Sequence, residues 1–169
     1  MDFLNLLKSR YSVRAYKNQP VEKEKLDKIL EAARLAPTAV NYQPFKLIVI
    51  KTKGRENELK RIYQAEWFYT APLVICVCCE PQNAWVRRDG KNFADVDATI
   101  VMDHIILAAT SLGLGTCWVG AFDAKAAAEI LKLPDEVEPL VFTPIGYPAD
   151  EMLVKKRKEI SELVRYDSW

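Results

Sequence analysis

The longest apolar stretch of the chain, residues 93–112, constrains the fold more than any other feature. Its apolar side chains run around most of the predicted helix, and a helix of that kind has to be buried on most of its sides. Either the core of the domain or a partner surface must therefore cover it. The run Gly113-Leu114-Gly115 ends this helix, because glycine is favoured just beyond a helix C-terminus.

Shorter patterns surround this helix with strands and further helices. Apolar runs predict strands at 46–50, 72–79, 116–119 and 139–145. Helical spacing and capping residues predict helices at 2–8, 21–35, 56–65 and 124–131. This mixture predicts an α+β fold in which helices pack on a central sheet. A chain of 169 residues without repeats or a linker is expected to form one domain over 1–169.

Net charge and hydropathy exclude several classes of protein. The formal net charge of +1 argues against a general nucleic-acid binder, which would present a strongly basic face. No apolar run approaches the roughly 20 residues that span a bilayer. The first residues lack the basic region and long apolar stretch of a signal peptide. We therefore expect a cytoplasmic protein that binds neither nucleic acid nor a membrane.

The cysteines do not form a metal-binding pattern. Cys76, Cys78 and Cys79 lie in one apolar run, where alternation along a strand puts Cys76 and Cys78 on one face and Cys79 on the other. The chain has one histidine, His104, and no pair of Cys-x-x-Cys motifs, so no metal site is expected. We interpret the cysteines as small core residues in a reducing compartment, and His104 as a core or interface residue.

Two arginines flank a serine near the start of the chain, in Arg10-Tyr11-Ser12-Val13-Arg14. A phosphate monoester carries nearly two negative charges, so it favours two guanidinium groups and a hydroxyl donor. Arg10, Ser12 and Arg14 are therefore candidates for a phosphate site. A solvated surface turn with incidental arginines is the alternative.

A second candidate segment is the loop bounded by Pro37 and Pro44. The two prolines restrict the backbone and pre-organise the loop. Asn41 and Gln43 can each donate and accept hydrogen bonds, which suits the alternating carbonyl and N–H groups at the edge of a flavin. Ordinary turn chemistry is the alternative interpretation.

A third candidate lies before the predicted helix 124–131, where Gly120 and Ala121 precede the capping residue Asp123. Free N–H groups at a helix start can donate to a ligand, and a glycine lets a ring approach the backbone closely. The glycine spacing in this region does not match a dinucleotide-binding fingerprint. The alternative is a plain helix end followed by a buried strand.

The last segment, 149–169, is charged and has too few apolar residues to build a core of its own. We expect it to wrap another surface, which a second subunit could provide. Its basic run 155–158 has the composition of a solvated face, but Lys155 and Arg157 could also complete the phosphate site.

Four segments together resemble the nitroreductase family of flavin mononucleotide (FMN) enzymes. In chain order they are Arg10-x-Ser12-Val13-Arg14, Ala36-Pro37-Thr38-x-x-Asn41-x-Gln43-Pro44-Phe45, 112–122 and 144–148. The chain looks like a compact member, with Phe45 where many relatives carry Trp. The resemblance implies a three-layer fold with a central, mostly antiparallel sheet, assembled as an intertwined homodimer with its tail wrapped around the partner.

The resemblance also implies roles for individual residues. The ribityl phosphate would be held by Arg10, Ser12, Arg14, Lys155 and Arg157. The isoalloxazine ring would be lined by Pro37, Thr38, Asn41, Gln43 and Gln64. The backbone amide of Gly120, with Ala121 beside it, would face the flavin N5.

The activity implied is that of an NAD(P)H-dependent oxidoreductase. NADH or NADPH would reduce FMN, and a small electron-poor acceptor such as a nitroaromatic or quinone would then take the electrons in a ping-pong sequence. No catalytic side chain is expected, because the flavin carries the chemistry. The polar loop 80–92 is expected to form a lid that selects acceptors.

Three alternatives stay open from the sequence. One is a flavin dehydrogenase or reductive dehalogenase with a dedicated substrate. Another is a flavin-binding redox sensor or storage protein, and the third is a structural domain without a cofactor. The sequence identifies neither the physiological acceptor nor the preferred nucleotide.

Overall fold

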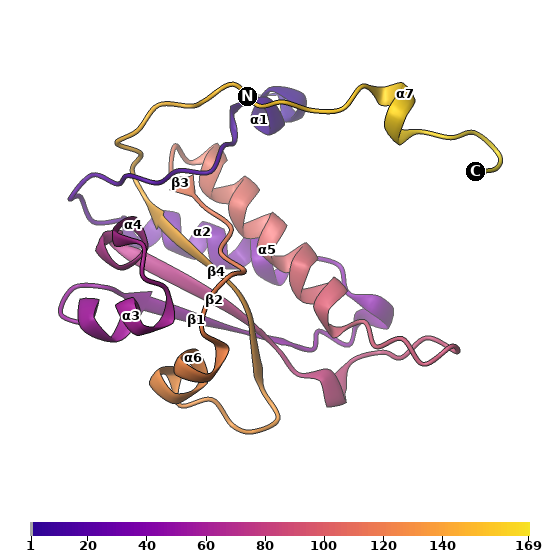
Figure 1. Ribbon diagram of the computed structural model, residues 1–169, viewed down its shortest axis with the longest axis horizontal. Coiled ribbons are helices and arrows are strands. Elements are labelled where there is room, and N and C mark those ends of the chain that lie inside the picture. Colours follow the sequence, from indigo (N-terminus) through magenta and orange to yellow (C-terminus); the bar gives the residue numbers. More distant parts are fainter. Residues whose placement is uncertain (1) are drawn as a thin grey trace.

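An antiparallel sheet with the strand order β1-β2-β4-β3 forms the centre of the protein (Figure 1). The computed structural model describes residues 2–169. The strands are β1 (Phe45–Lys51), β2 (Leu73–Cys79), β3 (Gly115–Thr116) and β4 (Glu138–Gly146). Every residue of β2 is buried, which explains why its sequence is a continuous apolar run.

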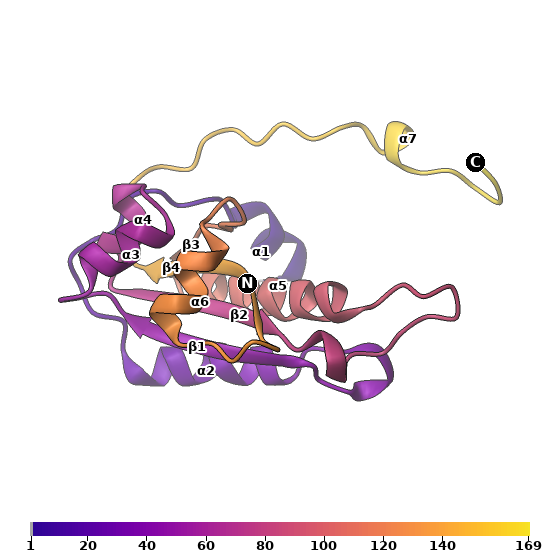
Figure 2. The same ribbon diagram turned by 60° about the horizontal axis from the view of Figure 1, so that its bottom comes forward.

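Helices cover both faces of this sheet (Figure 2). The face that carries Ile75 and Val77 packs against α2 (Lys23–Arg34) and α5 (Ala94–Ser111). The opposite face packs against α3 (Glu56–Ile62), α4 (Glu66–Thr70) and α6 (Ala124–Leu131). The expected three-layer α+β architecture is therefore confirmed.

Helix α5 matches the predicted helix 93–112, with one residue fewer at each end. Its end is formed by Gly113, whose φ of 77° lies in the left-handed region that favours glycine. The amide of Leu114 then donates to the Ala109 carbonyl at 2.9 Å and satisfies one of the last carbonyls of the helix. The glycine therefore turns the chain directly from α5 into β3.

Two predicted boundaries were wrong. The helix predicted over 56–65 ends at Ile62, because Tyr63 is extended and its ring packs edge-on against Trp67 and Phe68, both at 5.5 Å. The strand predicted over 116–119 pairs with β4 only at Gly115–Thr116, and rejoins it through an isolated bridge at Val119.

The cysteine prediction is confirmed. Cys76 and Cys78 lie in the core on one face of β2, with their sulfur atoms 3.5 Å apart, and Cys79 lies in the core on the other face. All four cysteines of the chain are free and buried.

Short elements complete the chain. They are α1 (Phe3–Ser9), the single turns η1 (Ala39–Asn41) and η2 (Pro81–Asn83), and α7 (Ile160–Leu163). The last part of the chain, which includes α7, extends away from the layers in both views (Figures 1 and 2).

Candidate functional site

The segment that carries the first motif runs along the short strand β3. The amide of Val13 donates to the Thr116 carbonyl at 2.9 Å, and the Val13 side chain is buried in the core. Because side chains alternate along an extended segment, Ser12 and Arg14 lie on the side opposite Val13. The backbone pairing therefore directs both residues away from the core.

Gly115 makes this close approach possible. A Cβ atom at this position would lie 2.5 Å from Cγ2 of Val13, well inside van der Waals contact. Any larger residue at 115 would push the Ser12 and Arg14 segment away from β3. The glycine is thus required by packing in the element next to the candidate site.

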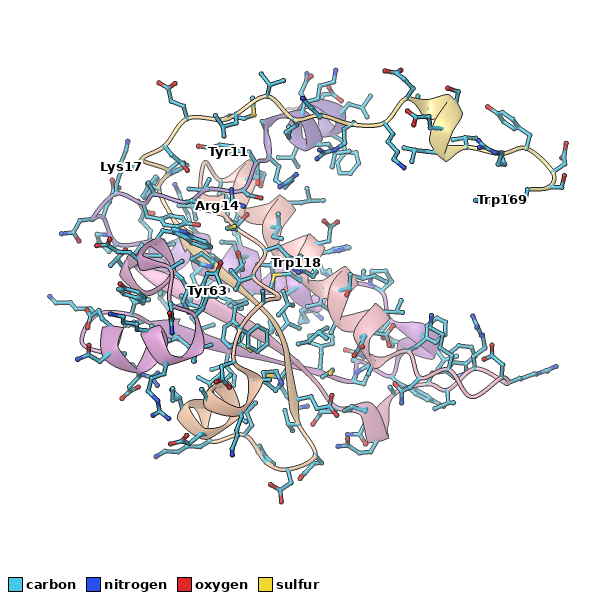
Figure 3. All side chains as sticks on the ribbon, in the orientation of Figure 1. Tyr11, Arg14, Lys17, Tyr63, Trp118 and Trp169 are labelled. Atoms are coloured by element: carbon cyan, nitrogen blue, oxygen red, sulfur yellow. The ribbon has the colours of Figure 1, made fainter. Side chains whose placement is uncertain are left out.

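A cleft of about 550 Å³ opens beside this segment. Its lining includes all five residues predicted to hold the phosphate, which are Arg10, Ser12, Arg14, Lys155 and Arg157. The structure therefore brings together cations from the two ends of the chain. Figure 3 shows Arg14 near Tyr11, close to where the tail leaves the domain.

The sequence interpretation missed Asp150, which shapes the cleft. Its Oδ2 accepts a hydrogen bond from the Arg14 amide at 2.7 Å, and its Oδ1 accepts one from the Tyr11 hydroxyl at 3.2 Å. Burial, followed by the charge of Asp150, raises the pKa of Tyr11. Asp150 therefore fixes the position of the Arg14 backbone, and with it the start of the Arg14 side chain.

Lys155 lies in the cleft, but its ammonium group already has partners. It donates to the carbonyl oxygens of Arg10 at 2.7 Å and of Lys8, at the C-terminal end of α1. Cations are stabilised at that end of a helix. Partial burial, with the charges of Arg10 and Arg157 adding to it, lowers the pKa of Lys155. Lys155 thus joins the tail to α1 and adds positive charge at the edge of the cleft.

Of the three guanidinium groups of the cleft, that of Arg157 donates a hydrogen bond to the Lys156 carbonyl at 2.9 Å. Among residues 2–169, no carboxylate forms a salt bridge with Arg10, Arg14 or Arg157. Arg14 lies over the ring of Trp67, with 6.0 Å between its Cζ and the ring centroid. Asp150 and Glu151 also line the cleft, but its four cationic side chains outnumber these two carboxylates, and the excess of positive charge favours an anion.

The Ser12 side chain forms a hydrogen bond with the buried thiol of Cys117. Burial raises the pKa of Cys117, while the charge of Arg14 and a hydrogen bond with Ser12 act in the opposite direction. Ser12 and Arg14 therefore both act on the same buried thiol.

The second motif forms a tight loop with unusual backbone angles. Val40, Asn41 and Gln43 have φ values of 46°, 60° and 54°, in the left-handed region that non-glycine residues rarely adopt. Thr38 Oγ1 accepts a hydrogen bond from the Gln43 amide at 3.0 Å. The side chains of Asn41 and Gln43 are exposed, and Pro37 at the start of the loop is exposed too.

One chain does not bring this loop to the phosphate cleft. The Ala39 amide bonds to Asp97 in the first turn of α5, whereas Arg10 lines a hollow beside Thr110, in the last turn. At about 1.5 Å per residue, the helix separates these two points by about 20 Å. The residues predicted for the phosphate and the ring residues of the loop 37–43 thus lie at opposite ends of α5 in a single chain.

Gly120 and Ala121 lie in an exposed turn before α6. The predicted cap is confirmed, since Asp123 Oδ1 accepts a hydrogen bond from the Ala126 amide at 2.9 Å. A Cβ atom on Gly120 would meet only Trp118 Nε1, at an ordinary contact distance of 3.7 Å. Packing within the chain therefore leaves room for a side chain at 120. Gln64 is exposed between α3 and α4.

Within residues 2–169, no three acidic, cysteine or histidine side chains are grouped so that they could hold a metal ion. The Nδ1 atom of His104 lies 3.0 Å from the Ile100 carbonyl of its own helix. None of the described helices is long and apolar enough to cross a membrane.

Comparison with known proteins identifies the family of the chain. The sequence model of the nitroreductase family matches residues 7–66 and 59–147. A Methanothermobacter thermautotrophicus protein named as an NADH dehydrogenase/NAD(P)H nitroreductase is 32% identical over 160 residues, which cover 89% of this chain and 79% of that protein. A Bacillus subtilis protein named FMN reductase (NAD(P)H) is 31% identical over 173 residues, covering 92% of this chain and 70% of that protein.

Solved structures give the same result. A nitroreductase family protein from Clostridium difficile 630 superposes with a TM-score of 0.91 at 41% identity and covers 100% of both chains. An FMN-dependent nitroreductase from Clostridium difficile R20291 superposes with a TM-score of 0.80 at 31% identity, covering 99% of this chain and 100% of that one. The strand order, the arginine-lined cleft and these matches together place the chain in the nitroreductase family.

Proposed function

We propose that the protein is an FMN-dependent oxidoreductase that takes reducing equivalents from NADH or NADPH. The observation that carries the proposal is the cleft lined by Arg10, Arg14 and Arg157, none of which forms a salt bridge with a carboxylate among residues 2–169. Bound FMN would supply the redox chemistry, accepting two electrons from the nucleotide and passing them to a second substrate. The names of the relatives from Methanothermobacter and Bacillus support this class of reaction.

The side chains of the cleft fit the phosphate end of FMN. A phosphate monoester carries about −1.5 to −2 charges at neutral pH and offers three acceptor oxygens. Arg10 and Arg14 would each donate in a forked geometry, and the Ser12 hydroxyl would donate a third hydrogen bond. Arg157 would close the cleft from the tail.

The other predicted residues would hold the ring. Asn41 and Gln43 carry carboxamides that can donate to the ring carbonyls and accept from its N–H group. The backbone amide of Gly120 would donate to the flavin N5, in a turn that is exposed and open. Pro37, Thr38, Ala121 and Gln64 would form the walls.

These roles require a second copy of the chain. The loop 37–43 and the arginine cleft lie at opposite ends of α5, so both can contact one flavin only if one of them comes from a partner. The tail supports the same proposal, because the side chains of Leu153, Val154, Tyr166 and Trp169 are each at least 80% exposed. We therefore propose a homodimer in which the tail of one copy covers the other.

The second substrate is proposed to be a small electron-poor molecule, such as a nitroaromatic or a quinone. It would bind in turn with the nucleotide over the exposed face of the ring. The loop 80–92 forms a projecting hairpin bridged at Val86 and Asn92. It adjoins the loop 37–43, since the Glu80 amide donates to the Pro44 carbonyl at 2.9 Å. We propose that this hairpin selects the acceptor.

The visible spectrum of the purified protein tests the proposal, followed by mixing with NADH or NADPH without oxygen. We expect a yellow protein whose flavin absorbance bleaches within seconds and returns when a quinone is added. A protein that stays colourless after incubation with FMN contradicts the proposal. Tight FMN binding with very slow bleaching by both nucleotides would favour a flavin sensor or store instead.

A further inference from the structure

Asp97 is a charged residue in the most apolar helix of the protein. It lies in the first turn of α5 and only 1% of its surface is exposed. Its Oδ1 accepts a hydrogen bond from the Ala39 amide at 2.9 Å. Its Oδ2 is buried and has no hydrogen-bond partner anywhere in the described chain. Burying a carboxylate with one oxygen unpaired is unfavourable, so something other than core packing accounts for Asp97.

Ala39, the hydrogen-bond partner of Asp97, belongs to a loop whose backbone conformation is strained. Val40 has φ 46°, although β-branched residues strongly avoid the left-handed region, and Asn41 and Gln43 are left-handed as well. Such a conformation persists only where its surroundings impose it, and it is concentrated at functional sites.

The other hydrogen bonds of this loop are local. Within residues 38–43 the Asn41 amide donates to the Thr38 carbonyl, and the Gln43 amide donates to the Thr38 hydroxyl. The bond from Ala39 to Asp97 instead joins residues that are 58 positions apart. Of the hydrogen bonds made by the 38–43 backbone within residues 2–169, it is the one that fixes the loop to the domain.

We propose that Asp97 is a positioning residue that holds the loop 38–43 in its strained form before any ligand arrives, so that Asn41 and Gln43 are presented in a fixed geometry. The inference rests on the proposed function for the identity of the ligand, since the flavin ring is what these carboxamides would contact. It does not depend on that function for the anchoring itself. Asp97 touches neither substrate nor cofactor in this account and acts through the Ala39 amide.

Replacing Asp97 should change the order of the loop 38–43 without lowering the stability of the fold. Asp97→Ala removes a buried carboxylate together with its unpaired oxygen, which relieves an unfavourable burial. It also removes the acceptor that holds the loop. The thermal midpoint should therefore stay the same or rise while binding weakens. Asp97→Asn retains a carbonyl oxygen for the Ala39 amide and should preserve the loop. Asp103→Ala, an exposed aspartate on the same helix, is the matched control.

The experiment measures amide hydrogen exchange over 38–43 in the flavin-free protein, and the dissociation constant for FMN. We expect Asp97→Ala to lose protection in this segment and to bind FMN roughly tenfold more weakly, the effect of one hydrogen bond to a charged group. Asp103→Ala should match the wild type in both measurements, and Asp97→Asn should retain most of the protection and affinity, because it keeps a neutral acceptor for the Ala39 amide.

Unchanged exchange in Asp97→Ala overturns the proposal. So does an Asp97→Ala protein that fails to fold or melts well below wild type, because that result assigns Asp97 to the core. If wild-type protein binds no FMN, the proposed function fails, and the exchange measurement still decides whether Asp97 anchors the loop.

Discussion

The main-chain amide of Arg14 donates a hydrogen bond to Oδ2 of Asp150 at 2.7 Å, although 136 positions separate the two residues. This contact joins the N-terminal motif to the start of the C-terminal tail. The cations of the cleft therefore come from two segments that the Asp150 carboxylate helps to hold together. Asp150 places the backbone of Arg14 while leaving its guanidinium free for an anion.

Replacing Arg14 should affect flavin binding much more than folding. Arg14→Ala removes a charge-assisted interaction worth about 1.5–3 kcal/mol, so the dissociation constant for FMN should rise by about ten- to a hundredfold. The thermal midpoint of the flavin-free protein should barely change, because the Arg14 side chain is exposed. Fluorescence titration with FMN measures the effect.

The control is Arg34→Ala, which removes an exposed arginine paired with Glu31 outside the cleft. It should bind FMN like the wild type. Full flavin occupancy of Arg14→Ala after extensive dialysis would show that the arginine does not hold the phosphate.

Removing the Asp150 carboxylate should loosen the cleft even though it removes a negative charge near the anion. Asp150→Ala frees the Arg14 amide and the Tyr11 hydroxyl from their acceptor. If positioning dominates, FMN binds several-fold more weakly. If charge dominates, FMN binds more tightly, and the role assigned to Asp150 is wrong. Fluorescence titration with FMN shows whether the dissociation constant rises or falls.

Adding one methyl group at Gly115 should destabilise the protein. In Gly115→Ala the new carbon would lie 2.5 Å from Val13, so the N-terminal segment must shift, at a typical overpacking cost of about 1–3 kcal/mol. Gly120→Ala is the matched control for stability, because its nearest neighbour lies at 3.7 Å. Urea unfolding of both flavin-free proteins makes the comparison. Equal midpoints would mean that the segment is not packed on β3 as described.

Alkaline pH should destabilise the fold through the buried thiol of Cys79. Burial, with Asp95 and Glu138 adding to it, raises the pKa of Cys79 from 9.0 to about 12. The folded state therefore holds this proton when the unfolded state has lost it. The protonated Cys79 thiol therefore contributes its full share to the free energy of unfolding below about pH 9, and this contribution is lost as the pH rises towards about 12.

The free energy of unfolding, measured in urea between pH 7 and 10.5, checks this sign. Cys79→Ala should show a shallower decline than the wild type, since the other titrating groups are common to both proteins. Parallel declines would remove Cys79 as a cause.

The tail should hold two copies together. A chain that ends at Lys158 keeps Lys155 and Arg157 but loses the apolar side chains of Ile160, Leu163 and Trp169, which are 64% to 104% exposed in a single copy. Sedimentation should show a dimer for the full chain and a shift towards monomer for the shortened one. A full-length protein that is monomeric when saturated with FMN would contradict the proposed sharing of the site.

The sequence predicted the layers, and grouped residues that do line one cleft, because the signals are local. The apolar run of β2, the helical run of α5 and the motif Arg10-x-Ser12-x-Arg14 can each be read within one short window. The position of Cys76 and Cys78 on the same face of β2 followed from side-chain alternation along a strand.

Asp150 and the partners of Lys155 escaped the sequence interpretation because they depend on contacts across more than a hundred positions. The positive φ of Val40 could not be predicted either, since a β-branched residue favours a negative φ. A signal was available for Asp97, because a carboxylate stands among apolar residues in the first turn of the buried helix.

The most direct test of the central claim compares FMN with riboflavin, which has the same ring and ribityl chain but no phosphate. Titration of the flavin-free protein should give an affinity for FMN at least a hundredfold above that for riboflavin, and Arg14→Ala should lose most of that difference. Equal affinities of the wild-type protein for the two flavins would contradict the assignment of the arginine cleft to a phosphate.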